Sequence, residues 1–202
     1  MRLHSTTAIR RHAAALRILL ILTLLTGIAY PLVVTGIAQL CFPFQANGSL
    51  LRRSGQVIGS ELLGQHFTTP TGAPDRAWFQ PRPSTGHYNA LSSGASNLGP
   101  NNATLLETVR QRRSQIALLD GVPPAAVPAD ATTASGSGLD PHISPAYAYQ
   151  QVNRIAHARR LPPVQVKALV ASHIEQRYAG FLGEQRVNVV KLNAALSSLR
   201  GP

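Results

Sequence analysis

Residues 18–41 of this chain read ILLILTLLTGIAYPLVVTGIAQLC, and no charged residue follows them until after Gln45. As a helix that rises about 1.5 Å per residue, this stretch extends about 36 Å, enough to cross a hydrocarbon core about 30 Å thick. A helix also satisfies its own backbone hydrogen bonds, as a lone segment in lipid must. The pattern therefore predicts a transmembrane helix over residues 18–44, with a kink at Pro31.

Charge on the two sides of this segment predicts its orientation. The arginines that precede it are Arg2, Arg10, Arg11 and Arg17. Only Arg52 and Arg53 follow it closely, so residues 1–17 form a basic tail that we expect in the cytoplasm, and residues 45–202 lie outside. A cleaved signal peptide is the alternative. Its apolar core is typically about 7–15 residues and ends in small residues, whereas this run ends in bulky Cys41-Phe42-Pro43-Phe44.

The remaining residues have the size of one compact domain with a net positive charge. After the span there are 15 basic and 8 acidic residues, a balance of about +7. The arginines are scattered and aromatic residues are few, which argues against nucleic acid as a partner, whereas Arg52 and Arg53 could meet lipid headgroups. Cys41 is the only cysteine, and without a Cys/His cluster the sequence predicts no metal site.

Capping residues and prolines divide the domain into short elements. Residues 56–67 favour a strand or hairpin. Asn102 can cap a helix over residues 103–119, and Ser144-Pro145 begins another that extends to about residue 160. Further helices are predicted over residues 164–177 and after Asn188. Polar segments 68–83, 91–102 and 122–140 are predicted loops, so the domain is a helix-rich α+β fold.

Three of these polar segments carry the candidate chemistry. They read WFQPRPS (78–84), YNALSSGASNLGPNN (88–102) and ASGSGLDPHISP (134–145). Such dense glycine and Asx residues build tight turns and nests of backbone N–H groups. Neither a phosphate-binding loop of the G-x-x-x-x-G-K-[ST] type nor a dinucleotide fingerprint occurs, so no nucleotide pocket is predicted.

A hydrolase is a second interpretation of the third segment, with Ser135 or Ser137, His142 and Asp140 as its parts. However, Asp140 and His142 flank Pro141, which makes a triad geometry awkward, and G-x-S-x-G is missing. The simpler interpretation is that Asp140 caps a turn and His142 hydrogen-bonds locally.

Taken in order, the motifs resemble the C subunit of the Kdp-type potassium-transporting ATPase, a bacterial pump in which a P-type ATPase subunit works with a channel-like subunit. The resemblance spans nearly the whole chain. It covers residues 30–36, 78–84, 88–89, 96–100, 133–145, 180–184, 187–189 and 192–193. The chain departs from the family pattern at Ala131-Thr132, where an apolar pair is usual, and at Lys191.

The resemblance implies an accessory subunit without its own catalytic centre, in the bacterial inner membrane and needed for assembly and stability of the pump. It implies as partners the P-type ATPase subunit, the channel-like potassium-binding subunit, a small single-span subunit and the lipid bilayer. ATP and potassium are ligands of that complex, and the chain's own motifs bind no cofactor. The family is also proposed to raise the ATPase subunit's affinity for ATP. The outside location predicts that any such effect is indirect.

The hypothesised interface consists of the loops over residues 78–84, 88–101 and 135–142, with Gly27 and Gly36 available for helix packing. The interface and family-motif residues are Trp78, Phe79, Gln80, Pro81, Arg82, Tyr88, Asn89, Asn97, Gly99, Pro100, Ser135, Gly136, Ser137, Gly138, Asp140, Pro141, His142, Ser144, Asn188 and Asn193. A membrane-anchored extracytoplasmic hydrolase is the alternative function, and a free-standing envelope protein that binds anionic lipid or polymer is a third.

Overall fold

The computed structural model of the chain describes residues 3–199. It contains two compact units that divide after Ser49, and each unit is described here by itself.

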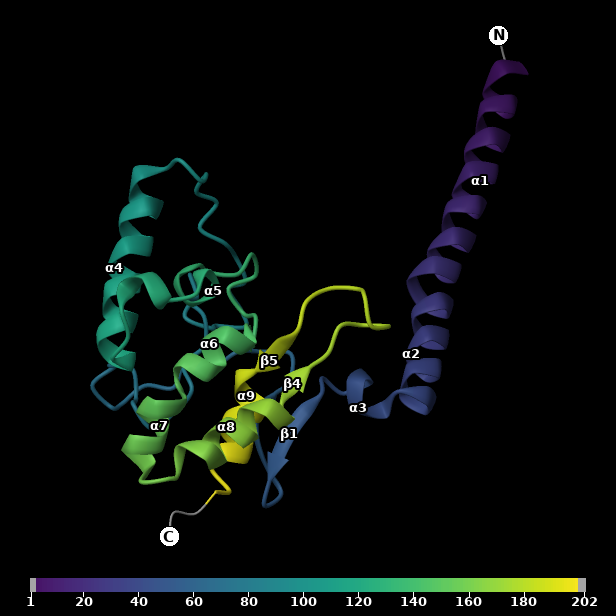
Figure 1. Ribbon diagram of the computed structural model, residues 1–202. Coiled ribbons are helices and arrows are strands. Elements are labelled where there is room, and N and C mark those ends of the chain that lie inside the picture. Colours follow the sequence, from purple (N-terminus) through teal and green to yellow (C-terminus); the bar gives the residue numbers. More distant parts are fainter. Residues whose placement is uncertain (1–2, 200–202) are drawn as a thin grey trace. The chain divides into compact units, whose positions relative to one another are not determined.

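The first unit is a long helix, drawn in purple and blue in Figure 1. It consists of α1 (Leu3–Leu24), the π-helical turn η1 (Leu25–Ala29) and α2 (Tyr30–Cys41). Its part from Thr7 to Cys41 is long and apolar enough to cross a membrane, which confirms the predicted spanning helix. The helix begins at Leu3 rather than at residue 18, because seven of the ten residues from 8 to 17 are alanine or arginine, which are strong helix formers.

The π-helical turn lies directly before Pro31, where a kink is predicted. Proline has no N–H, and its ring clashes with the carbonyl four residues earlier, here that of Gly27. In this turn the N–H of Tyr30 donates to the carbonyl of Leu25, five residues back. Such wider turns inside α-helices are one of the recognised causes of bending. After α2, Phe42 leaves the helical conformation, and the short α3 (Pro43–Ala46) follows.

The second unit begins with an antiparallel hairpin of β1 (Leu50–Arg53) and β2 (Gln56–Ser60). Ser54 and Gly55 form its turn, both with positive φ, as the type I′ hairpin turn requires. The predicted strand at residue 56 is confirmed, but its partner precedes it. β1 lies in residues for which no strand is predicted.

Helices make up most of the rest of this unit. They are α4 (Ala103–Asp120), the 3-10 turn η2 (Pro124–Ala126), α5 (Ala129–Thr132), α6 (Pro145–Gln150), α7 (Val152–Arg159), α8 (Pro163–Ser172) and α9 (Val189–Leu196). Asn102, Ser144 and Asn188 accept hydrogen bonds from the first turns of α4, α6 and α9, which confirms the predicted caps. The helix predicted over residues 145–160 is divided at Gln151.

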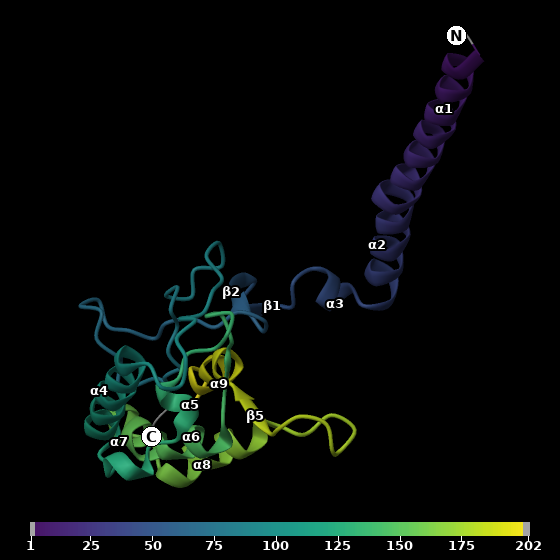
Figure 2. The ribbon, with the colours of Figure 1, turned by 90° about the horizontal axis from the view of Figure 1, so that it is seen from above.

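A small sheet has the strand order β3-β5-β4, formed by β3 (His142–Ile143), β5 (Arg186–Asn188) and β4 (Ile174–Glu175). All its pairs are antiparallel, with Val187 between Ile143 and Ile174. The helix predicted to reach residue 177 therefore stops at Ser172, because the next residues pair with β5 instead. In Figures 1 and 2 the connection between β4 and β5 projects from the helices.

The core of this unit lies between the helices and the inner face of the sheet. Its largest fully buried apolar side chains are Phe79, Tyr147, Ile155, Leu192 and Leu196. Phe79 comes from a loop, yet it is as inaccessible as the helical residues around it. The segment that contains it must therefore be held inside the domain with its backbone hydrogen bonds satisfied.

Side-chain amides satisfy this buried backbone. The N–H of Phe79 donates to Asn193 Oδ1 at 3.0 Å, and Asn193 Nδ2 donates back to the Phe79 carbonyl at 2.9 Å. Gln80 and Gln151 repeat the arrangement, at 2.6 Å and 3.1 Å. Each amide replaces one residue of a neighbouring strand, so a single loop is joined to α9 and to the α6–α7 junction.

A buried ion pair supports the same segment. Arg154 Nε lies 2.7 Å from Asp120 Oδ1, and both side chains are 1% exposed. Arg154 also donates to the carbonyls of Arg76 and Trp78, at 2.6 Å and 3.0 Å, and to Gln151 Oε1 at 2.6 Å. Because every one of these partners lies within the domain, the guanidinium connects α4, α7 and the loop before Phe79.

Replacing Asn193 by Ala is expected to lower the free energy of unfolding by about 2–4 kcal/mol, since it leaves both backbone groups of Phe79 buried without partners. Urea denaturation of the full chain, followed by the fluorescence of Trp78, its only tryptophan, measures the change. Asn153→Ala, at an exposed position of α7, is the matched control and is expected to change it by less than about 0.5 kcal/mol. Equal effects of the two variants would contradict the role given to Asn193.

Candidate functional site

The three loops of the hypothesised interface lie together. Ser84 Oγ donates to the Gly138 carbonyl at 2.6 Å, which joins the first loop to the third. The N–H of Gly94 and the hydroxyl of Ser93 both donate to the Ser137 carbonyl, at 2.9 Å and 3.0 Å, which joins the second to the third. We call these segments, residues 78–84, 88–101 and 135–142, the loop cluster.

Tyr88 ties the first two loops to each other. Its hydroxyl donates to the Arg82 carbonyl at 2.5 Å, and its N–H donates to Ser84 Oγ at 2.9 Å. Burial raises the pKa of Tyr88, and the neighbouring Asp140 adds to that effect, so the phenol stays a neutral donor. Both His87 and Tyr88 have positive φ, a conformation that non-glycine residues rarely adopt. The hydrogen bonds of Tyr88 therefore hold the backbone of residues 87–88 in this conformation.

Arg82, Asp140 and His142 form the polar centre of the loop cluster. Arg82 Nη1 lies 3.1 Å from Asp140 Oδ2, while Arg82 Nε donates to the Thr133 carbonyl at 3.2 Å. Asp140 Oδ1 accepts the His142 N–H at 3.0 Å and lies 2.9 Å from His142 Nδ1. Burial alone would raise the pKa of Asp140, but the hydrogen bonds from His142 and Arg82 outweigh it and lower the pKa.

Opposite charges continue from this centre across the small sheet. His142 Nε2 lies 3.7 Å from Glu175 Oε2, to which Arg186 Nε donates at 2.9 Å. Lys191 Nζ then lies 3.5 Å from carboxylate oxygens of both Glu175 and Glu61. Burial would raise the pKa of Glu175, but the hydrogen bond from Arg186 and the nearby positive groups lower it. The result is a connected row of ionisable side chains.

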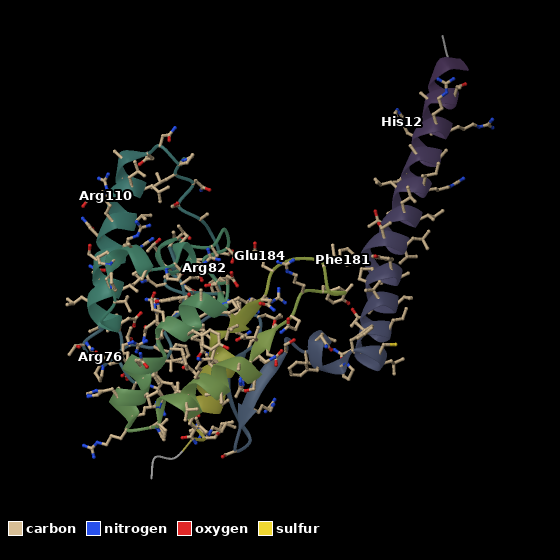
Figure 3. The ribbon with its side chains drawn as sticks, viewed as in Figure 1. His12, Arg76, Arg82, Arg110, Phe181 and Glu184 are labelled. Atoms are coloured by element: carbon tan, nitrogen blue, oxygen red, sulfur yellow. The ribbon has the colours of Figure 1, made fainter. Side chains whose placement is uncertain are left out.

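Two clefts flank the Arg82–Asp140 pair. One, of about 320 Å3, is also lined by Asp130, Glu184 and Arg186, and Figure 3 labels Arg82 and Glu184. The other, of about 550 Å3, is lined by residues 134–137 of the third loop together with Arg82, Asp140 and His142. Both clefts are open, and Arg82, Asp140 and His142, which line both of them, already have partners. Such surfaces suit recognition of another polar surface better than enclosure of a small apolar molecule.

Comparison with known proteins identifies the family. A family model described as KdpC, the c chain of the K+-transporting ATPase, matches residues 12–198. The potassium-transporting ATPase KdpC subunit of Streptomyces coelicolor is 46% identical over 216 aligned residues, covering 98% of this chain and 96% of that protein. The KdpC subunit of Polaromonas naphthalenivorans is 53% identical, with 92% and 93% covered. That of Gemmatimonas aurantiaca is 52% identical, with 88% and 87% covered.

The chain belongs to the KdpC family. This match confirms the predicted resemblance, and the chain is a KdpC subunit of a potassium-transporting ATPase. Membership implies partner subunits and a place in a membrane-associated pump, which agrees with the spanning helix.

Within this KdpC chain, the arrangement of His142 differs from that of a serine hydrolase. A triad needs one imidazole nitrogen on the aspartate and the other on the nucleophilic hydroxyl. Here Nδ1 faces Asp140 and Nε2 faces Glu175. Ser135 and Ser137 instead accept backbone N–H groups from Gly138 and Leu139, at 2.9 Å and 3.1 Å. In the described residues no group of three or more His, Cys, Asp or Glu could hold a metal ion.

The structure separates the predicted site residues into three groups. Those buried inside the domain are Phe79, Gln80, Gly138, Pro141, Asn188 and Asn193. Those partly exposed are Trp78, Pro81, Arg82, Tyr88, Ser135, Asp140, His142 and Ser144. Those exposed are Asn89, Asn97, Gly99, Pro100, Gly136 and Ser137. The first group therefore builds the domain, and only the other two present atoms to a partner.

Sequence reasoning missed several residues that position the site. Gln151 and Arg154 bond to the backbone of the first loop and of the residues just before it from inside the domain. Glu175 continues the row of ionisable side chains beyond His142. One signal was available for Arg154, because it lies beside Val152 and Ile155 on the buried side of α7, where a charge needs a partner. No local pattern pointed to its partner, Asp120.

Gly138→Ala is expected to destabilise the domain by about 1–3 kcal/mol. Gly138 has a φ of +67°, and an added Cβ would lie 2.8 Å from the Gly94 carbonyl oxygen. Gly136→Ala, two residues earlier, is the matched control, because its Cβ would meet no atom within 4 Å. Urea denaturation followed by Trp78 fluorescence compares the two. An unchanged midpoint for Gly138→Ala would mean that the loops do not depend on this close approach.

Stability is expected to fall at acidic pH through Asp140 and Glu175. Their folded-state pKa values are lowered, so their contribution is fully present above the ordinary carboxyl pKa of about 4 and is lost as pH falls through the folded pKa. The measurement is the urea midpoint of the full chain as a function of pH. The double variant Asp140→Asn, Glu175→Gln should show a weaker dependence below about pH 5, whereas Glu107→Gln, on the exposed face of α4, should retain it.

Proposed function

We propose that this chain is a non-catalytic accessory subunit of an ATP-driven potassium uptake pump, which it helps to assemble and stabilise. Relatives that match it over nearly their whole length are named as KdpC subunits of a potassium-transporting ATPase. Its partners would be the P-type ATPase subunit, the channel-like potassium-binding subunit and a small single-span subunit.

We further propose that residues 1–17 lie in the cytoplasm and that the domain lies on the extracytoplasmic side of the bacterial inner membrane. The excess of arginines before the span supports this orientation. The loop cluster would then meet the outer face of the membrane-embedded partners.

The observation that carries the proposal is the internal bonding of the loop cluster. Two neighbouring loops and a third that is distant in sequence share hydrogen bonds at Ser84, Gly94 and Ser137, and Arg82 and Asp140 bind each other beside them. A surface whose shape is set before binding loses little conformational entropy when a partner docks. Around this centre, exposed polar residues such as Asn89 and Asn97 offer hydrogen-bonding groups.

Any effect of this subunit on the affinity for ATP would be indirect in this orientation. The whole loop cluster would lie across the membrane from cytoplasmic ATP. Docking would act by favouring one conformation of the whole complex, which is how two distant sites are coupled. A direct attraction for potassium is not expected either, because the domain is net positive and Asp140 is paired with Arg82.

The first experiment is co-purification with a C-terminal tag after gentle solubilisation. Stoichiometric recovery of a P-type ATPase subunit and a large channel-like subunit is the expected result. Recovery of the chain alone would remove the main support for the proposal. In that case, turnover by the isolated chain that is lost on changing Ser137 or His142 would favour the hydrolase alternative.

Asp140→Ala is expected to reduce recovery of the partner subunits, or pump activity, while leaving membrane insertion intact. The change removes the acceptor of both Arg82 and His142 at the centre of the loop cluster. Co-purification yield per inserted chain is the measurement. Glu107→Ala, which removes a carboxylate from an exposed pair on α4, is the control and should leave the yield unchanged. A normally assembled and fully active Asp140→Ala pump would count against this role for Asp140.

A further inference from the structure

The connection between β4 and β5 is a long hairpin that projects from the domain. Every residue from Gln176 to Arg186 is exposed, although the strands at its base are half-buried or buried. Figures 1 and 2 show the connection extending away from the helices of the second unit in both views. We call residues 178–183 at its end the hairpin tip.

The hairpin tip is apolar and uncharged. Tyr178 is 83% exposed, Phe181 is 71% exposed and Leu182 is 53% exposed, and Figure 3 labels Phe181 at the projecting end. Between Arg177 and Glu184 the chain carries no charge. Three large apolar side chains that are exposed side by side, away from any core, indicate a binding surface.

The backbone of the hairpin tip is hydrogen-bonded internally. The N–H of Tyr178 donates to the Leu182 carbonyl and the N–H of Leu182 donates back, both at 2.9 Å. Phe181 N–H donates to the Tyr178 carbonyl at 3.3 Å, which closes a turn whose central residues, Ala179 and Gly180, both have positive φ. A turn that satisfies its own N–H groups can leave water at a much lower cost than an open loop can.

Charged residues flank the hairpin tip on both strands. Arg177 is exposed directly beside the hairpin tip, and Glu184 follows it on the other side. At the base of the hairpin Arg186 bonds to Glu175, so the hairpin as a whole carries no net charge. Arginine and tyrosine beside apolar side chains are typical of segments at the membrane–water interface.

We propose that the hairpin tip inserts into the headgroup region of the bilayer that the chain's own helix spans, with phospholipid as its partner. Because Tyr and Phe bury about 150–250 Å2 each and Leu182 is smaller, the three side chains offer less than the roughly 800 Å2 per partner of a standard protein interface. The residues on both sides of the tip are exposed as well, so no buried surface adjoins the tip. The inference does not depend on the proposed role in the pump.

The test uses the full chain in nanodiscs of phosphatidylethanolamine and phosphatidylglycerol, with and without bromine on the acyl chains. Phe181→Trp reports on the hairpin tip, and Leu91→Trp, at a 97% exposed position of the loop cluster, is the matched control. The emission of the parent chain, which comes from Trp78 alone, is subtracted. Urea midpoints equal to that of the parent show that both variants are folded.

The proposal expects the added emission of Phe181→Trp to be blue-shifted and to lose most of its intensity with brominated lipid, whereas Leu91→Trp shows neither effect. Adding Leu182→Asp to Phe181→Trp should remove both the blue shift and the quenching, because a charge at the tip opposes insertion. Emission of Phe181→Trp like that of Leu91→Trp would overturn the proposal. A blue shift without quenching would overturn it as well, since the tip would then be covered by protein, such as a second copy of the chain.

Discussion

Buried side-chain amides hold the backbone of Phe79 and Gln80, and the rest of the domain depends on this contact. Asn193 and Gln151 bond to that backbone as a neighbouring strand would, from two different helical regions. The buried guanidinium of Arg154 secures the residues just before it. Since polar groups without partners are costly in a core, these bonds leave little freedom for the segment. Phe79 can then fill the core, and Arg82, three residues further on, lies at the polar centre of the loop cluster.

From Arg82 onward the structure is organised by paired charge. Asp140 joins Arg82 to His142, His142 approaches Glu175, and Arg186 and Lys191 complete the row. Asp140 and Glu175 each accept from more than one partner, so both carboxylates of the row are well satisfied. Satisfied groups make a stable, defined surface.

The domain presents two kinds of surface that differ in chemistry. The loop cluster is polar, assembled from two neighbouring segments and a distant third, and stiffened by contacts between them. The hairpin tip is apolar, local in sequence, and stiffened by its own turn. A polar preformed surface suits a protein partner, whereas a small apolar projection suits lipid. Together with the spanning helix, they suggest how one short chain could be oriented and docked at the same time.

The sequence by itself determined the features that depend on neighbouring residues. The uncharged run predicted the spanning helix, and Asn102, Ser144 and Asn188 predicted three helix starts, because burial in lipid and capping act within a few residues. The tertiary structure decided which motif residues are buried. Phe79 and Asn193 were expected at an interface, but they bind each other across 114 positions. Strand β4 and the Arg154–Asp120 pair were likewise invisible, because short strands and buried charges are stabilised by partners that only folding brings near.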